Sequence, residues 1–341
     1  MSTTKVTLGH VAREAGVSIS TASEALSGRG RMTAATRQSV RDAAERLGYR
    51  PNALARSLRT GRTHAIALHH LDAANSFDTE YFREFVAGVM DVTRTHDYDL
   101  TLLSSDPDRR RPVAPQVDGI IIADPIADDL RAVELLSAGL PVVAGERYPP
   151  GMPDSPVIGI GHEQALIELL DHAYDVGVRR PMLFTPDDNS GWGIVLRDAF
   201  LAWCHDHELE GLHRVTRFVS ARTIQYPALE EAVAGPDPVD LVIMSGEHAA
   251  LAAIDWLRDH DLVVGRDILL AATADARLLQ RAEPPVTAID LSPRDLGSAC
   301  AQALIRHLDE GTELAPLTLL PPKLFLREST AALTRRRRPP E

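Results

Sequence analysis

The sequence is poor in cysteine and has no hydrophobic run long enough to span a membrane. Its two cysteines, Cys204 and Cys300, lie too far apart for a disulfide framework, which is typical of a reducing compartment. The first residues lack the apolar segment of a secretory signal. We therefore expect a cytoplasmic protein with no membrane partner.

Motifs for common enzyme chemistries are also missing. The chain has no nucleophile elbow, Walker loop or H-E-x-x-H motif. Residues 204–207 (C-H-D-H) offer too few ligands for a structural zinc site, and we expect them on an exposed helix face. The sequence thus predicts a protein that is not an enzyme and uses neither a metal nor another cofactor.

Negative charge dominates the chain as a whole but not its first part. The 341 residues carry a formal net charge of −12. Residues 1–63 contain eleven basic and four acidic side chains, a net charge of +7, so the remainder carries −19. This basic segment favours a polyanion such as nucleic acid as its partner. The length and the apolar content of 44% predict two or three compact units.

The first fifty residues predict three short helices. Apolar residues recur at helical spacing from Leu8 until Gly16, which fits a left-handed helix end. Ser18 and Thr33 are suitable caps for a second and a third helix. The first two helices must cross closely, because their facing residues are the small Ala12, Ala15 and Ala22. This arrangement predicts a helix-turn-helix whose second helix enters the major groove of DNA.

Two patterns carry a family resemblance. T-L-x-x-V-A-x-x-A-G-V-S-x-S-T-x-S covers residues 7–23, and L-G-Y-R-P-N-A-L-A-R-S-L-R-T-G covers residues 47–61. In both, the chain resembles the lactose-repressor and galactose-repressor (LacI/GalR) family of transcriptional regulators. The resemblance implies a DNA-binding headpiece at 1–49, a hinge helix and linker at 50–62, and an effector-binding and dimerisation core at 63–330. The composition of the last residues predicts a basic disordered tail at 331–341.

The resemblance also implies DNA contacts. Bases are read from Ile19, Ser20 and Glu24 on the second helix. Further contacts are expected from Thr7, and phosphate contacts from Ser18, Thr21, Ser23 and Ser27. On the hinge helix the contacting residues are Asn52, Ala55 and Leu58, with the leucine as a wedge in the minor groove at the centre of a bent, palindromic operator.

Glu24 departs from the family, which usually has arginine at this position. A glutamate can accept a hydrogen bond from the N4 amino group of cytosine. Alternatively, Glu24 pairs with a nearby arginine on a solvated helix face. The operator sequence of relatives therefore does not transfer to this chain.

Beyond residue 63, apolar runs alternate with helical patterns. The runs "HAIALHHL", "DLTLLS", "GIIIA", "LPVVAG", "RPMLFT", "DLVIMS" and "DILLAAT" each predict a buried parallel strand, and helices are expected at 81–96, 164–177, 194–208 and 248–260. This pattern predicts an α/β fold of doubly wound units. The resemblance implies a two-lobed core like that of periplasmic sugar-binding proteins, with three crossovers and a ligand in the cleft, where strands end.

Family motifs suggest ligand contacts in the first part of this core. Asn75 and Phe77 match the family's D-x-x-N-P-F-F, and His162 belongs to a cleft-facing segment. Arg197 matches S-x-x-x-R-x-x-G-F loosely, and it either forks onto ligand hydroxyls or carboxylates or lies on the helix surface. Trp192 either stacks on a sugar ring or covers the core of its lobe.

Later motifs have lost polar positions. Glu247 is expected to take the acidic role of the A-N-D-x-x-A motif, in which Gly246 stands for a polar residue. In the G-[FY]-D-D motif, Asp275 remains and Ala274 replaces the first aspartate. These losses indicate a different effector from the familiar sugars, or a weakened response.

The crossover at 104–118 is unusual, because three prolines replace the helix that the family has there. An irregular loop is expected, with an altered sheet face or subunit contact. We interpret the chain as a homodimeric transcriptional regulator. It is expected to bind operator DNA as a repressor, and a small carbohydrate is expected to modulate this binding. Three alternatives stay open: a regulator of this family that senses no ligand, an exported solute-binding protein, and an α/β enzyme.

Overall fold

The chain divides into two compact units in a computed structural model. The structure describes residues 6–26, 30–49, 61–103, 113, 116–153, 155–185, 190–215, 226–235 and 237–333. One unit comprises Met1–Thr63, the headpiece, and the other comprises His64–Glu341, the core. The expected hinge helix, most of the 104–118 crossover and the basic tail from residue 334 lie outside the described residues.

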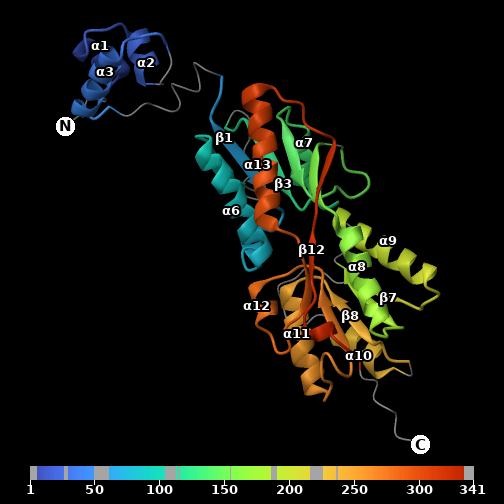
Figure 1. The fold of residues 1–341 in the computed structure, drawn as a ribbon. Coiled ribbons are helices and arrows are strands. Elements are labelled where there is room, and N and C mark those ends of the chain that lie inside the picture. Colours follow the sequence, from blue (N-terminus) through green and yellow to red (C-terminus); the bar gives the residue numbers. More distant parts are fainter. Residues whose placement is uncertain are drawn as a thin grey trace, which may run out of the picture. The chain divides into compact units, whose positions relative to one another are not determined.

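Three helices form the headpiece, as expected: α1 (Leu8–Glu14), α2 (Ile19–Leu26) and α3 (Ala34–Arg46) (Figure 1). The turn after α1 places Gly16 at φ +67°, a conformation that favours glycine. The predicted caps are confirmed, since the Ser18 hydroxyl accepts from Thr21 N–H at 3.1 Å and Thr33 accepts from Thr36 N–H at 3.1 Å.

Small side chains dominate the interior of the headpiece. Its buried residues are Val11, Ala12, Ala22, Ala25, Val40, Ala43 and Ala44. Because alanine adds little bulk between helices, α1 and α2 approach closely enough for the tight turn between them. The surface of α2 opposite this core is left to solvent.

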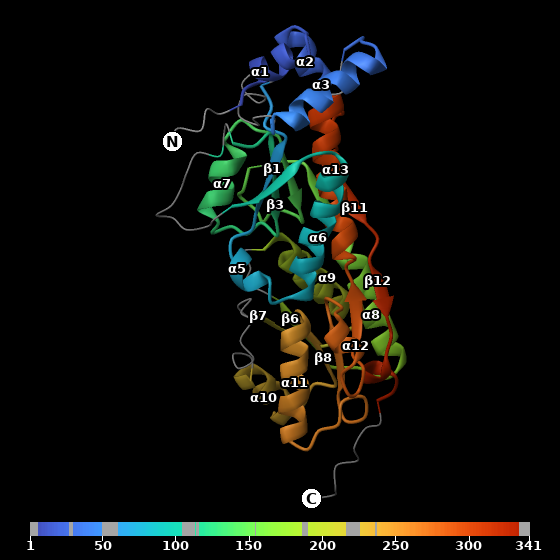
Figure 2. The same ribbon diagram turned by 90° about the vertical axis from the view of Figure 1, so that its left-hand side faces the viewer.

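Two six-stranded sheets organise the core (Figures 1 and 2). The upper sheet has the order β11-β5-β4-β3-β1-β2, with β1 (Ala65–His69), β2 (Asp99–Leu102), β3 (Gly119–Ala123), β4 (Val142–Gly145), β5 (Val157–Ile160) and β11 (Leu317–Leu320). The lower sheet has the order β12-β10-β9-β8-β6-β7, with β6 (Pro181–Thr185), β7 (Leu212–Val215), β8 (Leu241–Met244), β9 (Leu269–Ala272), β10 (Thr287–Asp290) and β12 (Lys323–Phe325). Neighbouring strands of the described sheets pair in parallel, except β10 with β12, which are antiparallel.

Helices cover the sheets, which makes each sheet the centre of a lobe. The upper lobe contains α5 (Ala73–Ser76), α6 (Glu80–Thr95), α7 (Leu130–Leu136) and α13 (Pro293–Glu310). The lower lobe contains α8 (His162–Asp175), α9 (Gly191–Asp206), α10 (Tyr226–Ala234), α11 (Glu247–Asp259), α12 (Arg277–Gln280) and the 3₁₀ helix η2 (Glu328–Thr330). The chain passes between lobes after β5, after β10 and after β11. These passages are the three expected crossovers.

The close contact between α6 and α13 depends on glycine. A Cβ at Gly88 would collide with the backbone carbonyl of Arg294, and a Cβ at Gly297 would collide with that of Phe85. The two backbones therefore touch, which locks α13 onto the upper lobe.

The expected elements are largely present, with three corrections. The four predicted core helices begin one to three residues earlier than expected. In two of them, α6 and α9, Thr79 and Ser190 cap the earlier start. The strand β2 is not buried as predicted, because it is an edge strand with mostly exposed residues. Cys204 is likewise buried within α9, and His207 stacks on Trp203, so this segment is not a simple exposed face.

Candidate functional site

The N-terminus of α2 gathers hydroxyl groups on the headpiece surface. Ser18 Oγ lies 2.8 Å from both Ser20 Oγ and Thr21 Oγ1. The first N–H groups of a helix attract anions. Beside them, the Ile19 side chain is 59% exposed, although burial would stabilise it. An anion-binding edge and an apolar contact thus lie together on α2.

The carboxylate of Glu24 lies against the next loop. A Cβ at Gly30, which has φ +84°, would collide with this carboxylate. The guanidinium of Arg37 donates to the Gly30 carbonyl at 3.3 Å. The Glu24 carboxylate therefore lies against the backbone of the chain at Gly30. Both interpretations of Glu24, a contact with cytosine and a pairing with a nearby arginine, stay predictions. At the start of α1, Thr7 N–H donates to His10 Nδ1 at 3.1 Å.

In the core, polar residues follow four strands of the upper sheet. His70 follows β1, Asp124 follows β3, Glu146 follows β4, and His162 follows β5 by one further residue. Carboxyl ends of parallel strands lie at one edge of a sheet, where α/β proteins bind ligands. We call these four residues, together with Tyr81 and Trp192, the upper cluster.

Direct contacts join the members of the upper cluster in two groups. His162 Nε2 donates to Glu146 Oε1 at 3.1 Å, and the His162 ring stacks on Trp192 with centroids 5.9 Å apart. Tyr81 Oη donates to Asp124 Oδ1 at 3.3 Å. His70 Nε2 lies 3.8 Å from Asp124 Oδ2, which is beyond a good hydrogen bond. The cluster therefore joins residues that follow four strands with residues on the helices α6, α8 and α9.

Burial controls the protonation of this cluster. Burial, followed by the nearby charge of Glu146, raises the pKa of Asp124 to about 8. Burial and the adjacent His69 lower the pKa of His70 to about 4, so that its ring is neutral at pH 7. Burial also raises the pKa of Tyr81, and Asp124 raises it further. Asp124 and Tyr81 thus retain their protons at neutral pH.

Comparisons with known proteins now decide the family. A sequence profile described as "Bacterial regulatory proteins, lacI family" matches residues 7–52, and one described as "Periplasmic binding protein-like domain" matches residues 170–330. The HTH-type transcriptional regulator RafR of Escherichia coli is 31% identical over 258 residues, which is 72% of this chain and 76% of RafR. The chain belongs to the LacI family.

Solved structures of this family share its fold. The lac repressor dimer bound to operator and the anti-inducer ONPF aligns with a TM-score of 0.81 at 21% identity, over 96% of this chain and 99% of that chain. A complex of the transcriptional regulator CelR with cellobiose aligns with a TM-score of 0.71 at 24% identity, over 95% and 99% of the two chains. This LacI-family chain is thus a transcriptional regulator with a periplasmic-binding-protein-like core, and not an enzyme.

Of the predicted ligand residues, His162 and Trp192 belong to the upper cluster. Asn75 Nδ2 instead donates to both carboxylate oxygens of Asp72, at 3.0 and 2.9 Å. The Phe77 ring packs edge-on against Phe82. In this structure Asn75 and Phe77 support the loop after β1.

Arg197 lies in the second turn of α9, the helix that Ser190 caps. Its Nε donates to Asp198 Oδ1 at 2.9 Å, and its side chain is 27% exposed. The contact of Arg197 with an effector stays a prediction.

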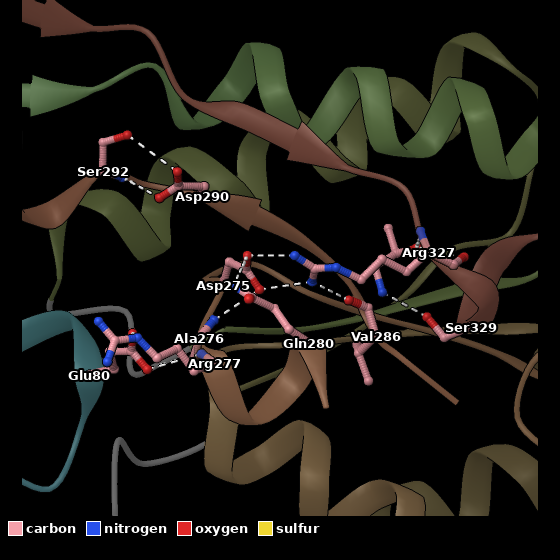
Figure 3. Close-up of polar contacts among 11 residues, drawn as sticks. Glu80, Asp275, Ala276, Arg277, Gln280, Val286, Asp290, Ser292, Arg327 and Ser329 are labelled. Atoms are coloured by element: carbon pink, nitrogen blue, oxygen red, sulfur yellow. Dashed lines mark hydrogen bonds and ion pairs between the residues drawn. The ribbon is translucent and has the colours of Figure 1, made fainter. Parts of the chain in front are cut away.

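Two predicted acids of the lower lobe bind protein groups. Glu247 Oε1 accepts from the backbone N–H of Glu80 at 3.1 Å, at the start of α6 in the other lobe. Asp275 forms a two-armed ion pair with Arg327, with N–O distances of 2.8 and 2.6 Å (Figure 3). Both acids have structural partners before any ligand binds.

Our sequence reasoning did not include Asp124, Glu146 or Tyr81 among the candidates. The available signal was position, because Asp124 and Glu146 each directly follow a buried strand. Ser27, Asn52, Ala55 and Leu58 lie outside the described residues. Within the described part of the chain, no three metal-ligating side chains gather, and no helix is long and apolar enough to cross a bilayer.

Proposed function

We propose that this chain is a repressor that binds a pseudo-palindromic operator as a homodimer. A small carbohydrate that binds in the core changes its affinity for the operator. The observation that carries the DNA part is the N-terminus of α2, where three hydroxyls adjoin an exposed Ile19 on a basic headpiece. The dimer is proposed because the aligned lac repressor is a dimer bound to operator.

Phosphate and base contacts then separate on α2. The Ser18 and Thr21 hydroxyls and the helix N-terminus suit phosphates, which fix the register of the headpiece, and Ser20 keeps its expected base contact. Ile19 suits an apolar contact with a base edge such as a thymine methyl. Binding is expected to weaken steeply with salt, because each neutralised phosphate releases counterions.

The effector part is supported by the upper cluster, which offers hydrogen-bonding groups and the indole of Trp192 at the strand ends. Carbohydrate is proposed because CelR was solved with cellobiose. A ligand that contacts both lobes changes their closure, and regulation then requires different affinities for two states of the lobes. Leu58, in the proposed hinge, transmits this change as a minor-groove wedge.

Fluorescence anisotropy of the full chain on its own promoter DNA tests the proposal. We expect specific binding that salt weakens and a sugar alters. Ile19→Ala should weaken specific binding about tenfold or more but spare competitor DNA, while Leu130→Ala, which removes another exposed side chain (66% exposed), should change neither. Loss of Leu58 to alanine should act as Ile19→Ala does. Equal affinity for operator and random DNA would contradict the proposal.

A second candidate is a LacI-family regulator that senses no ligand. The contacts of Glu247 with α6 and of Asp275 with Arg327 favour it, because they occupy two acids expected to bind an effector. Calorimetry of the full chain against a panel of sugars separates the candidates. Specific operator binding with no heat from any sugar would favour this one.

A further inference from the structure

Glu146 is a buried acid whose hydrogen bonding is incomplete. Its side chain is 1% exposed, and His162 serves Oε1 at 3.1 Å. Among the described residues, none donates a hydrogen bond to Oε2. A buried carboxylate oxygen without a donor is destabilising, and proteins retain few of them. This oxygen points to a ligand group that donates to it.

A second acidic side chain, Asp124, lies near Glu146, but no lysine or arginine pairs with either of them in the described chain. Asp124 is near enough for the charge of Glu146 to raise its pKa. The other titratable groups around the two acids are His70, Tyr81, His162 and Cys300. Within the described chain, neither carboxylate is paired with a lysine or an arginine. Neither acid therefore has a permanent counter-charge within the described chain.

The backbone keeps these acids at positions that suit glycine better. Asp124 has φ +46° and Glu146 has φ +94°, both in the left-handed region that side chains disfavour. A residue other than glycine is strained in this region, and such strain concentrates at ligand sites. Strain, burial and like charge thus act on the same two residues.

We propose, building on the effector function above, that the effector carries a cationic nitrogen that Asp124 and Glu146 bind together; among sugars, this describes an amino sugar. A protonated amine donates up to three hydrogen bonds, which suits Glu146 Oε2 and the Asp124 carboxylate at once. Trp192, stacked on His162, supplies an aromatic face of the kind that attracts cations.

A neutral hydroxyl fits less completely. It can donate to Glu146 Oε2, but it leaves the charge of the acid pair uncompensated in a buried site. A cation provides both the hydrogen bond and the opposite charge. The proposal therefore predicts discrimination between ligands that differ only in this charge.

Calorimetry of the full chain with matched sugars tests this discrimination. The probes are glucosamine and galactosamine, with glucose, galactose and N-acetylglucosamine as neutral counterparts. Thermal unfolding in methylammonium chloride, against sodium chloride at equal ionic strength, tests the cation alone. We expect an amino sugar to bind about tenfold or more tightly than its neutral counterpart, and methylammonium to raise Tm above the sodium value.

Variants identify the acids responsible. Glu146→Gln keeps an acceptor for His162 but removes the charge, so it should abolish both preferences without lowering the ligand-free Tm. Asp124→Asn is a second variant with the same expected loss, should Glu146→Gln fold poorly. Glu313→Gln, at an exposed acid of the upper lobe, should preserve both preferences.

The outcomes separate this inference from the proposed function. Equal binding of glucose and glucosamine would overturn the cationic effector and leave a sugar-responsive regulator. No gain from any amine, methylammonium included, would also overturn it, while the operator titration decides the DNA-binding function independently. Preferences that persist in both Glu146→Gln and Asp124→Asn would place the cation elsewhere and refute the assignment.

Discussion

Acids near the strand ends of the two core sheets differ in whether the chain supplies a counter-charge for them. In the lower lobe, Asp275 is matched by the two arms of Arg327, at 2.8 and 2.6 Å. In the upper lobe, Asp124 has Tyr81 as its hydrogen-bond donor and a neutral His70 at 3.8 Å. Asp275 thus has a counter-charge within the chain. Asp124 has none among the described residues, and its pKa is raised to about 8.

This difference separates structural acids from candidate ligand acids. Arg327 also donates to the Val286 carbonyl and lies 5.5 Å from the centre of the Phe325 ring. Its ion pair therefore fastens the β12 segment to the lower sheet. No comparable anchor surrounds Glu146 among the described residues. A polar residue near a strand end thus indicates a ligand site only when the chain leaves it unmatched.

The largest expected effect comes from breaking the matched pair. Arg327→Met leaves Asp275 buried without its counter-charge, so we expect a loss of about 3–5 kcal/mol in the free energy of unfolding. Urea unfolding measures it. Arg281→Met, at an exposed position, should change stability by less than about 0.5 kcal/mol. If adding Asp275→Asn to Arg327→Met restores nothing, the unpaired charge is not the cause.

A smaller effect of opposite sign is expected in the upper cluster. The pKa of Asp124 rises from 3.8 to about 8 on folding, so the folded state holds a proton that the unfolded state has released, and stability falls as pH rises from about 4 to 8. The pKa of His70 falls from 6.5 to about 4 on folding, so its contribution to stability increases as pH rises through that interval. This gain offsets the loss from Asp124 below pH 6.5. The uncompensated loss falls between pH 6.5 and 8.

Asp124→Asn should therefore stabilise the protein at pH 8 by about 2 kcal/mol, with a gain that shrinks towards pH 4. Thermal unfolding at several pH values measures the difference between variant and wild type. The control is Asp255→Asn, on the exposed side of α11, which should not show this pH-dependent gain. A constant difference at all pH values would contradict the assigned pKa.

Local chemistry explains what the sequence predicted well. Gly16, Ser18 and Thr33 act on neighbouring backbone groups, so their roles follow from spacing alone. Buried strands such as β3 were recognised from continuous apolar runs. The pairing of Asp275 with Arg327 joins residues 52 positions apart in the chain. No local pattern reports such a partner. Asp275 was assigned to the ligand from a family motif, and that contact stays a prediction.

The same reasoning explains the missed residues. Glu146 follows an apolar run as many ordinary loop acids do, and its missing donor is a property of the packed lobe. Arg197 was assigned from a loose motif, and its role in ligand binding stays a prediction. Family patterns locate the site region, whereas the balance of donors and charges emerges only in three dimensions.

The smallest expected effect concerns a third kind of acid, Glu80, whose partner lies in the other lobe. Its carboxylate accepts from the backbone N–H of Arg277 at 2.9 Å and lies 3.3 Å from the Arg277 guanidinium (Figure 3). The Arg277 side chain is 73% exposed, so solvent screens the ion pair. Arg277→Ala should lower stability by less than about 0.5 kcal/mol, with a loss that disappears in high salt.

Glu80→Gln sharpens this comparison, because it keeps an acceptor for the backbone N–H and removes the charge. We expect Glu80→Gln to match Arg277→Ala in urea unfolding, whereas Glu80→Ala should be more destabilising by about 1 kcal/mol, since it also leaves that N–H without its acceptor. If all three variants are equal, the backbone hydrogen bond adds nothing. The lobes would then be joined at this point by charge alone, and the contact would differ from the Asp275 pair in degree of exposure and not in kind.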